Sequence, residues 1–272
     1  MVNFNLTNIS FHGIITISMK GDIFMDKKDK KLKVGDSNIN YQGLNMTIIE
    51  FNSPTDFYVK FENGYIKHCT AGGNFRKGLI KNTMVPTVYN VGYIGEIKGA
   101  ISKNYSYKIW YHMIGRCYNK KDKHYCNYGG NGVIVCEEWK NYSNFKDWFD
   151  LNVYTINDDI LCIDKDILIK GNKIYSPETC ILIPSRLNKI VENAKKIRGE
   201  YKLGVSYHKK IQKYIASSNN NYIGCYKTEN EAFVAYKTYK EQYIKKIADE
   251  YKDKIPQKLY EALYNWKIEE DD

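Results

Sequence analysis

The first hundred residues alternate apolar and polar positions in short runs, which is typical of β-strands. Phe57–Phe61 alternates with period two, and the Asn63–Gly64 pair after it predicts a tight hairpin turn with positive φ at both residues. Met46–Phe51 is a further run suited to a strand. We therefore expect residues 1–100 to form a small β-barrel or SH3-like unit, to which Leu6–Phe24 adds one more hairpin.

From Tyr105 onward the apolar residues take up helical spacing. Tyr128–Gly132 predicts a tight structural turn whose free amides could also hold a phosphate, and Val133–Cys136 predicts a short strand. Two predicted helical faces flank this turn and strand, and they consist of Tyr107, Trp110, Ile114 and Cys117 and of Trp139, Tyr142, Phe145 and Phe149.

Two short apolar runs and a helix come next. Ile160–Ile163 and Cys180–Ile183 are predicted strands, and Pro184 suits the first turn of a helix because it has no N–H to leave unpaired. We expect a ββα unit with flanking helices within residues 101–198. The face of its helix consists of Leu187, Ile190, Val191 and Ala194.

The last third predicts a sheet packed on a long helix. Strands are expected at Ile211–Ala216 and Tyr222–Tyr226, and Thr228–Glu231 has the spacing of a capping box that opens the helix. We assign this sheet-and-helix unit to residues 199–254 and a C-terminal tail, acidic at Glu269–Asp272, to residues 255–272. The whole chain is thus expected to be an α+β protein of several units.

Charge gives the chain a preference for polyanions. Its 41 Lys and Arg residues against 31 Asp and Glu residues leave a formal net charge of +10. Between Lys195 and Lys254, 14 basic residues face 7 acidic ones, a surplus of 7 in under a quarter of the chain. Nucleic acid is the commonest partner of such a field. The alternative is that lysine is the default polar residue in an AT-biased genome.

Seven cysteines without a CxxC pair are expected to be reduced thiols of a cytoplasmic protein, in the host cytoplasm if the gene is phage-encoded. No secretory signal and no apolar stretch of about 18 residues is visible, so we expect no membrane partner. Buried packing is favoured over a zinc site for the one group of candidate ligands, because its spacing lacks a regular knuckle. That group is His112, Cys117, His124, Cys126 and Cys136.

A basic segment in the last third is the best candidate for contact with DNA. If Tyr207–Tyr214 is one strand, Lys209, Ile211 and Lys213 share one face, and His208, Lys210, Gln212 and Tyr214 share the other. A β-ribbon of this kind fits the major groove, where lysine contacts phosphate or guanine and glutamine reads adenine. The alternative is a solvated edge strand protected by lysine. The candidate DNA-binding residues are His208, Lys209, Lys210, Gln212, Lys213 and Arg198.

The order of these segments resembles that of known phage proteins. The spacing Trp110-x-x-Met113-x-x-Arg116-Cys117, followed by Tyr128–Trp139, is similar to a module of HNH-type proteins of phages and mobile elements. Asp164–Asp166, with Gly171–Asn172 and Tyr175–Cys180, resembles the ββα core of that module. The segment from Leu203 to about Lys246 is similar to an AP2-type DNA-binding domain.

The resemblance implies a DNA endonuclease that uses one divalent ion, Mg²⁺ or Mn²⁺. It implies Asp164 as an acidic metal ligand on the first strand, Asn188 as a ligand from the helix, and Asn172 as the residue that orients the base. The chain departs from that family at Lys165, which stands where a histidine base is expected, and leaves Asp166 as a weaker candidate base. The candidate catalytic residues are therefore Asp164, Lys165, Asp166 and Asn172.

Two functions follow as hypotheses. The first is a duplex-DNA-binding, metal-dependent endonuclease whose site preference comes from the C-terminal sheet. The second is a non-catalytic binder with a degenerate nuclease core, which regulates phage DNA or inhibits a host defence protein, and Lys165 favours this reading. A DNA-mimic inhibitor fits poorly because the chain is basic.

Overall fold

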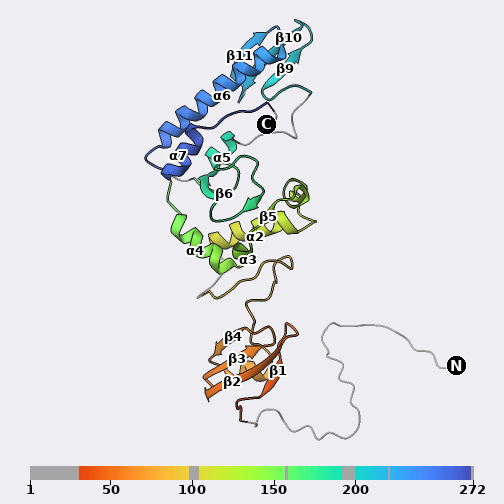
Figure 1. Ribbon diagram of the computed structural model, residues 1–272, viewed down its shortest axis with the longest axis vertical. Coiled ribbons are helices and arrows are strands. Elements are labelled where there is room, and N and C mark those ends of the chain that lie inside the picture. Colours follow the sequence, from red (N-terminus) through yellow and green to blue (C-terminus); the bar gives the residue numbers. More distant parts are fainter. Residues whose placement is uncertain (1–30, 98–103, 157–158, 192–199, 220, 271–272) are drawn as a thin grey trace, which may run out of the picture. The chain divides into compact units, whose positions relative to one another are not determined.

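The computed structural model describes residues 31–97, 104–156, 159–191, 200–219 and 221–270 (Figure 1). The chain divides into two compact units between Asn82 and Thr83, and each is described by itself. Both units combine helices with small sheets, so the predicted mixed α+β class is confirmed at this level. The hairpin predicted at Leu6–Phe24 lies outside the described residues.

The first unit is an open antiparallel sheet in the order β1-β2-β3-β4, followed by a short helix. The expected closed barrel is wrong, because β1 and β4 have only three and four residues and do not pair with each other in the described chain. The C-terminal end of that helix contacts β1 instead, where Asn38 Nδ2 donates to the carbonyls of Phe75 and Arg76. The elements are β1 (Ser37–Ile39), β2 (Asn45–Ser53), β3 (Asp56–Phe61), β4 (Ile66–Cys69) and α1 (Gly72–Arg76).

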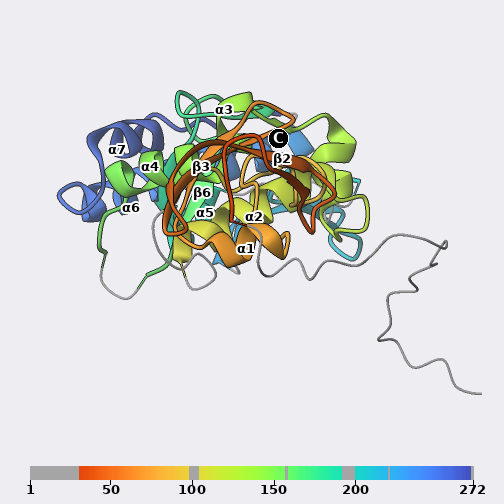
Figure 2. The same cartoon turned by 90° about the horizontal axis from the view of Figure 1, so that it is seen from below.

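The strands of this unit curve strongly, and α1 lies to one side of them (Figure 2). One face of β2 and β3 is buried at alternate positions, as the period of two predicts. Phe75 of α1 covers this face and meets Phe57 edge to face, with ring centroids 6.3 Å apart. The buried core includes Met46, Ile48, Phe57, Val59, Phe61 and Phe75.

The β3–β4 hairpin is confirmed, but the predicted turn type is wrong. Gly64 has a φ of +88°, whereas Asn63 does not have a positive φ. The Gly64 N–H donates to the Phe61 carbonyl, and the Phe61 N–H donates to the Tyr65 carbonyl. This is the arrangement of a three-residue loop that ends in a left-handed glycine. Asn63 instead uses its side chain to accept from the Tyr65 N–H.

The second unit begins earlier than the boundary expected near residue 100. Val88 and Ile94 belong to its hydrophobic core. The Tyr93 N–H donates to the Lys140 carbonyl, and the Tyr93 carbonyl accepts from Tyr142. These backbone bonds attach residues 83–97 to the helices that follow, so this segment belongs with the second unit.

The helices of the second unit bury the aromatic residues that the spacing indicated. Trp110 and Trp139 are fully buried, and the Trp110 indole donates to the Trp139 carbonyl at 2.6 Å. The second predicted face is divided between two helices, because Asn141 is extended and its side chain caps the second one by accepting from the Ser143 N–H. The helices are α2 (Tyr105–Tyr118), α3 (Glu137–Lys140) and α4 (Tyr142–Asn152).

The expected ββα order is present in the centre of this unit. Strands β6 and β8 pair antiparallel, and helix α5 follows directly. A second small sheet pairs β5 with β7 in parallel, which attaches the segment after the glycine turn to the loop between β6 and β8. The bounds are β5 (Ile134–Val135), β6 (Leu161–Asp164), β7 (Ile174–Tyr175), β8 (Ile181–Pro184) and α5 (Ser185–Val191).

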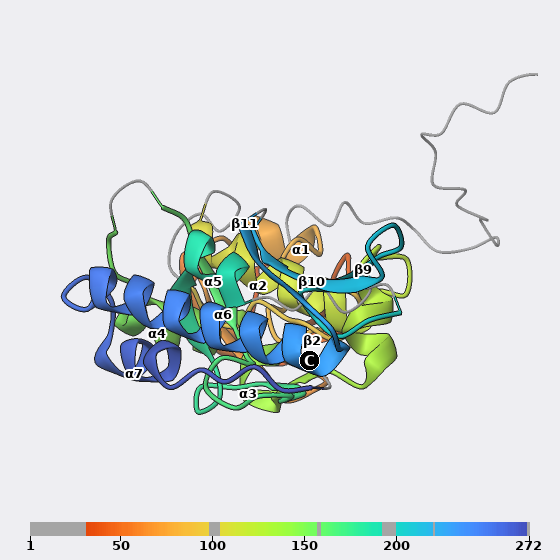
Figure 3. The ribbon, with the colours of Figure 1, turned by 90° about the horizontal axis from the view of Figure 1, so that it is seen from above.

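The last part of the chain is a three-stranded meander packed on a long helix. Strands β9, β10 and β11 lie side by side along α6 (Figures 1 and 3). The predicted capping box is confirmed, since the Glu231 N–H donates to Thr228 Oγ1 and the Glu231 carboxylate accepts from the Thr228 N–H. The bounds are β9 (Val205–His208), β10 (Lys213–Ser218), β11 (Asn221–Tyr226) and α6 (Glu229–Tyr251).

The segment expected as a C-terminal tail contains a helix, α7 (Gln257–Tyr264), that packs against α6. Leu259 and Leu263 are buried one helical turn apart, and Trp266 and Ile268 are also buried. Apolar residues at this spacing stabilise a helix only when a partner surface receives them. The charged residues among them concealed that spacing in the sequence.

Candidate nucleic-acid interface and the central ββα unit

The C-terminal sheet has one face covered and one face open. Ala216 of β10 is fully buried in the core that also contains Phe233 and Tyr236 of α6. Because side chains of a strand alternate, Lys213 and Ile215 lie on the opposite face. The pairs His208 with Lys213 and Ser206 with Ile215 then place the β9 residues on the same outer face.

Three basic residues form a row across the outer face of the sheet. His208 pairs with Lys213, and Tyr214 pairs with Tyr226. Lys227 directly follows Tyr226, the last residue of β11, and so lies at the same end of the sheet as Lys213. We call His208, Lys213 and Lys227 the basic row. Lys227 was missed by the sequence reasoning, because only the pairing of β10 with β11 brings it to the end of the sheet where Lys213 lies.

The strand expected across Tyr207–Tyr214 is interrupted, so the predicted division of its side chains between two faces is wrong. Residues 209–212 form the loop of the β9–β10 hairpin. Gln212 has a φ of +52°, a left-handed conformation that ends any strand at this point. Lys209, Lys210 and Gln212 therefore project from the hairpin tip, next to the basic row, instead of lying on opposite faces of one strand.

The basic side chains of this surface are open to an external partner. His208, Lys209, Lys210, Lys213 and Lys227 are all exposed. Within the described part of the chain none of the four lysines forms an ion pair. Lys237 and Lys267, by contrast, both pair with Glu241, at 3.3 and 3.5 Å. Four exposed lysines without an ion pair in the described chain thus lie together at one end of the sheet.

Glycine at position 204 lets the chain enter this sheet close to the helix. Gly204 has a φ of +75°, and a Cβ atom there would lie 2.0 Å from the Tyr236 ring. A larger residue would have to displace that ring from the core. The close approach holds β9 against α6 and so positions the hairpin tip.

In the central ββα unit, Asp164 ends β6 and serves the loop that follows. Its Oδ1 accepts the backbone N–H groups of Asp166 and Ile167, both at 2.7 Å. Burial raises the pKa of the Asp164 carboxyl above its ordinary value, and these two hydrogen bonds oppose that rise. The carboxylate therefore shapes the backbone turn at the end of the strand.

Lys165, at the position where the resemblance implies a histidine, is held by hydrogen bonds within the loop. Its side chain is buried, and Nζ donates to Asp166 Oδ2 at 2.6 Å and to the Asn172 carbonyl at 2.7 Å. An ammonium in this state has no lone pair with which to take a proton from water. The same contact neutralises Asp166, the weaker candidate base.

Asn172 completes the loop. Its Nδ2 donates to the carbonyls of Lys165 and Ile174, at 2.9 and 2.7 Å, and its Oδ1 accepts from the Ile174 N–H. Lys165 and Asn172 therefore hold each other across the loop. The structure brings Asp164, Lys165, Asp166 and Asn172 together, but as a closed network of internal bonds.

The residues at this end of β6 do not fit a Mg²⁺ or Mn²⁺ site. Asn188, on α5, has a buried Oδ1 without a hydrogen-bond partner among the described residues. Asp164 Oδ1 is already shared by two amides, and the buried Lys165 ammonium would repel a second cation. Arg198, and Ala194 of the predicted helix face, lie outside the described residues.

The cysteines among the candidate zinc ligands differ in their exposure. Cys117 is buried, whereas Cys126 is exposed and Cys136 is partly exposed. Across the ranges that the structure covers, no three His, Cys, Asp or Glu side chains come together as a metal site. Burial raises the pKa of the Cys117 thiol to about 11, as expected for a thiol that packs in a core.

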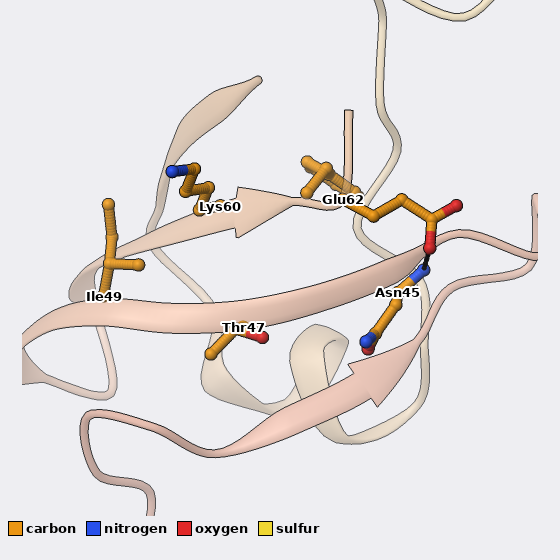
Figure 4. Close-up of a pocket in the computed structure, with 6 residues that line it drawn as sticks. Asn45, Thr47, Ile49, Lys60 and Glu62 are labelled. Atoms are coloured by element: carbon orange, nitrogen blue, oxygen red, sulfur yellow. Dashed lines mark hydrogen bonds between the residues drawn. The ribbon is translucent and has the colours of Figure 1, made fainter. Parts of the chain in front are cut away.

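The first unit has a shallow hollow of about 310 Å³ on the outer face of β2 and β3 (Figure 4). Lys60 and Glu62 bring opposite charges to it, and Glu62 Oε2 accepts from the Asn45 N–H at 3.2 Å. This mixed lining favours no particular class of ligand. The hollow is lined by Asn45, Thr47, Ile49, Lys60, Phe61 and Glu62.

Within the described ranges, no helix has both the length and the apolar content needed to cross a membrane. Comparison with known proteins places the chain in no family: no family model, no curated protein and no solved structure matches it.

Proposed function

We propose that this protein binds duplex DNA through the outer face of its C-terminal sheet. The observation that carries the proposal is the basic row of His208, Lys213 and Lys227, which continues into Lys209 and Lys210 at the hairpin tip. Lysines that lack carboxylate partners can neutralise DNA phosphates, which displaces condensed counterions from the DNA, and this release drives association.

The shape of the sheet supports the same partner. A two-stranded β-ribbon fits the major groove of B-DNA, and the β9–β10 hairpin presents its tip and one face without obstruction from α6. Few side chains on this face suit direct reading of bases, and Gln212 at the tip is the best placed of them. Affinity in this proposal therefore comes mainly from phosphate contacts.

Binding of a labelled 20-base-pair duplex, followed by fluorescence anisotropy, tests the proposal. If Lys209, Lys210, Lys213 and Lys227 each contact a phosphate, affinity should fall roughly 100-fold between about 50 and 200 mM salt. Saturable binding at low salt with this dependence is the expected result. A protein that leaves the duplex free at the lowest salt would contradict the proposal, and capture of a host protein would then become the better interpretation.

The central ββα unit acts as a scaffold in this proposal. Its bonds between Lys165, Asp166 and Asn172 occupy the groups that hydrolysis would need. Metal-dependent cleavage remains a second candidate, because the order of β6, β8 and α5, with Asp164 at the end of β6, is the order that the resemblance to HNH-type proteins implies.

We expect supercoiled plasmid to stay intact during incubation with the protein and Mg²⁺ or Mn²⁺, because Lys165 and Asp166 neutralise each other. Agarose gel electrophoresis of the plasmid checks this expectation. Asp164→Asn is the matched variant, since it keeps an oxygen at the same place. Nicking by the wild type that disappears in Asp164→Asn would instead establish the endonuclease.

A further inference from the structure

Arg116 of α2 carries a charge that the described chain does not neutralise. Its Nε is buried without a hydrogen-bond partner. The one hydrogen bond of its side chain runs from Nη1 to the Tyr128 hydroxyl, at 3.4 Å, and no carboxylate of the described residues pairs with it. A guanidinium has several N–H donors, so most of its capacity is left unused.

Two tyrosine rings flank this guanidinium. The Arg116 Cζ lies 4.6 Å from the centroid of Tyr128 and 5.7 Å from that of Tyr175. Cation–π contacts offset part of the charge, but they supply no lone pairs for the remaining N–H groups. Tyr175 is buried and its hydroxyl makes no hydrogen bond to the described chain, so it is a further donor beside the arginine.

The neighbouring groups exclude an internal anion. Asp122 acts on Arg116 electrostatically but forms no ion pair with it, and its Oδ1 accepts from the His124 N–H. In the glycine turn, the N–H groups of Asn131 and Val133 are not free to bind a ligand, because both already donate to the Tyr128 carbonyl. The missing partner must therefore come from outside this cluster.

We infer that Arg116, together with the Tyr128 and Tyr175 hydroxyls, binds a phosphate group. A planar guanidinium matches two phosphate oxygens with paired hydrogen bonds, and phenolic hydroxyls donate to the same kind of oxygen. Arg116 is partly exposed, so an external ligand can reach it. The site belongs to the central part of the second unit and does not depend on the proposed DNA contact of the C-terminal sheet.

Arginine-selective NMR of the full-length chain tests this inference. The sequence has four arginines, so ¹⁵N-arginine labelling gives four Nε–H signals. Replacing chloride by inorganic phosphate at constant ionic strength should move one signal, and that signal should be absent from Arg116→Lys. Thermal unfolding should show a saturable rise in Tm with phosphate that is lost in Arg116→Lys and kept in Lys108→Gln, an exposed control on the same helix.

A duplex oligonucleotide, added without free phosphate, identifies the source of the phosphate. Movement of the Arg116 signal by the duplex, even in a variant that lacks Lys213 and Lys227, assigns the site to a nucleic-acid backbone. Movement with inorganic phosphate alone assigns it to a free phosphate ligand. An Arg116 signal that neither probe moves in a folded protein would overturn the inference, as would a full phosphate response of Tm in Arg116→Lys.

Discussion

Reversing two charges of the basic row, by Lys213→Glu combined with Lys227→Glu, is expected to weaken duplex binding roughly 100-fold at about 100 mM salt. Both lysines are exposed and have no ion pair in the described chain, so their charge is available to phosphate. The slope of log affinity against log salt should also decrease by about 1.8, because two phosphate contacts are lost. Fluorescence anisotropy over a salt series measures both quantities.

The matched control reverses two other exposed lysines, by Lys246→Glu on α6 and Lys258→Glu on α7. This pair changes the net charge of the chain by the same amount but leaves the sheet intact. Its affinity for the duplex should stay within about threefold of the wild type, since only the long-range field changes. Equal losses in the two double variants would mean that net charge, rather than this face, determines binding.

The second large effect is expected in stability, at Asp164. Asp164→Ala should lower the free energy of unfolding by about 2–4 kcal/mol, because the Asp166 and Ile167 N–H groups lose their shared acceptor. Urea unfolding followed by circular dichroism measures this difference. Asp164→Asn keeps an acceptor oxygen in the same place and should be at least as stable as the wild type.

The pH dependence separates the charge of Asp164 from its hydrogen bonds. Because burial raises the pKa of Asp164 in the folded protein, the folded state holds this proton more firmly than the unfolded state does. The resulting stability is complete below the unfolded pKa of 3.8 and is lost as pH rises through the folded value. Asp164→Asn should therefore gain stability relative to the wild type over that range. An Asn variant as unstable as Ala at neutral pH would contradict this account.

Much of the fold could be predicted because local chemistry decides it. The Thr228–Glu231 capping box satisfies backbone amides within one helical turn, so its consequence does not depend on the rest of the chain. The same holds for the period of two along β3 and for the apolar runs that became β6 and β8. In the Asn63–Gly64 turn the hairpin was predictable, but the turn type was not, because Asn63 had a side-chain bond as an alternative.

Sites that depend on distant partners could not be predicted in the same way. The alternating Tyr207–Tyr214 segment is compatible with one strand or with two strands and a loop, and the left-handed Gln212 decides for the loop. Asn141 similarly divides what its neighbours' spacing suggested to be one helix. In both cases one backbone conformation, stabilised by its surroundings, outweighs a regular pattern.

Residue types and spacing alone established the mixed α+β class, the ββα order and the excess of positive charge in the last third. The partners of particular charged side chains were decided only by tertiary packing. Lys165 forms a buried ion pair, Arg116 has no ion-paired carboxylate among the described residues, and Lys213 pairs across the sheet with His208. The physical reason is range: helix and strand preferences act over a few residues, whereas the partner of a charge is set by strand register and by contacts between segments far apart in the chain.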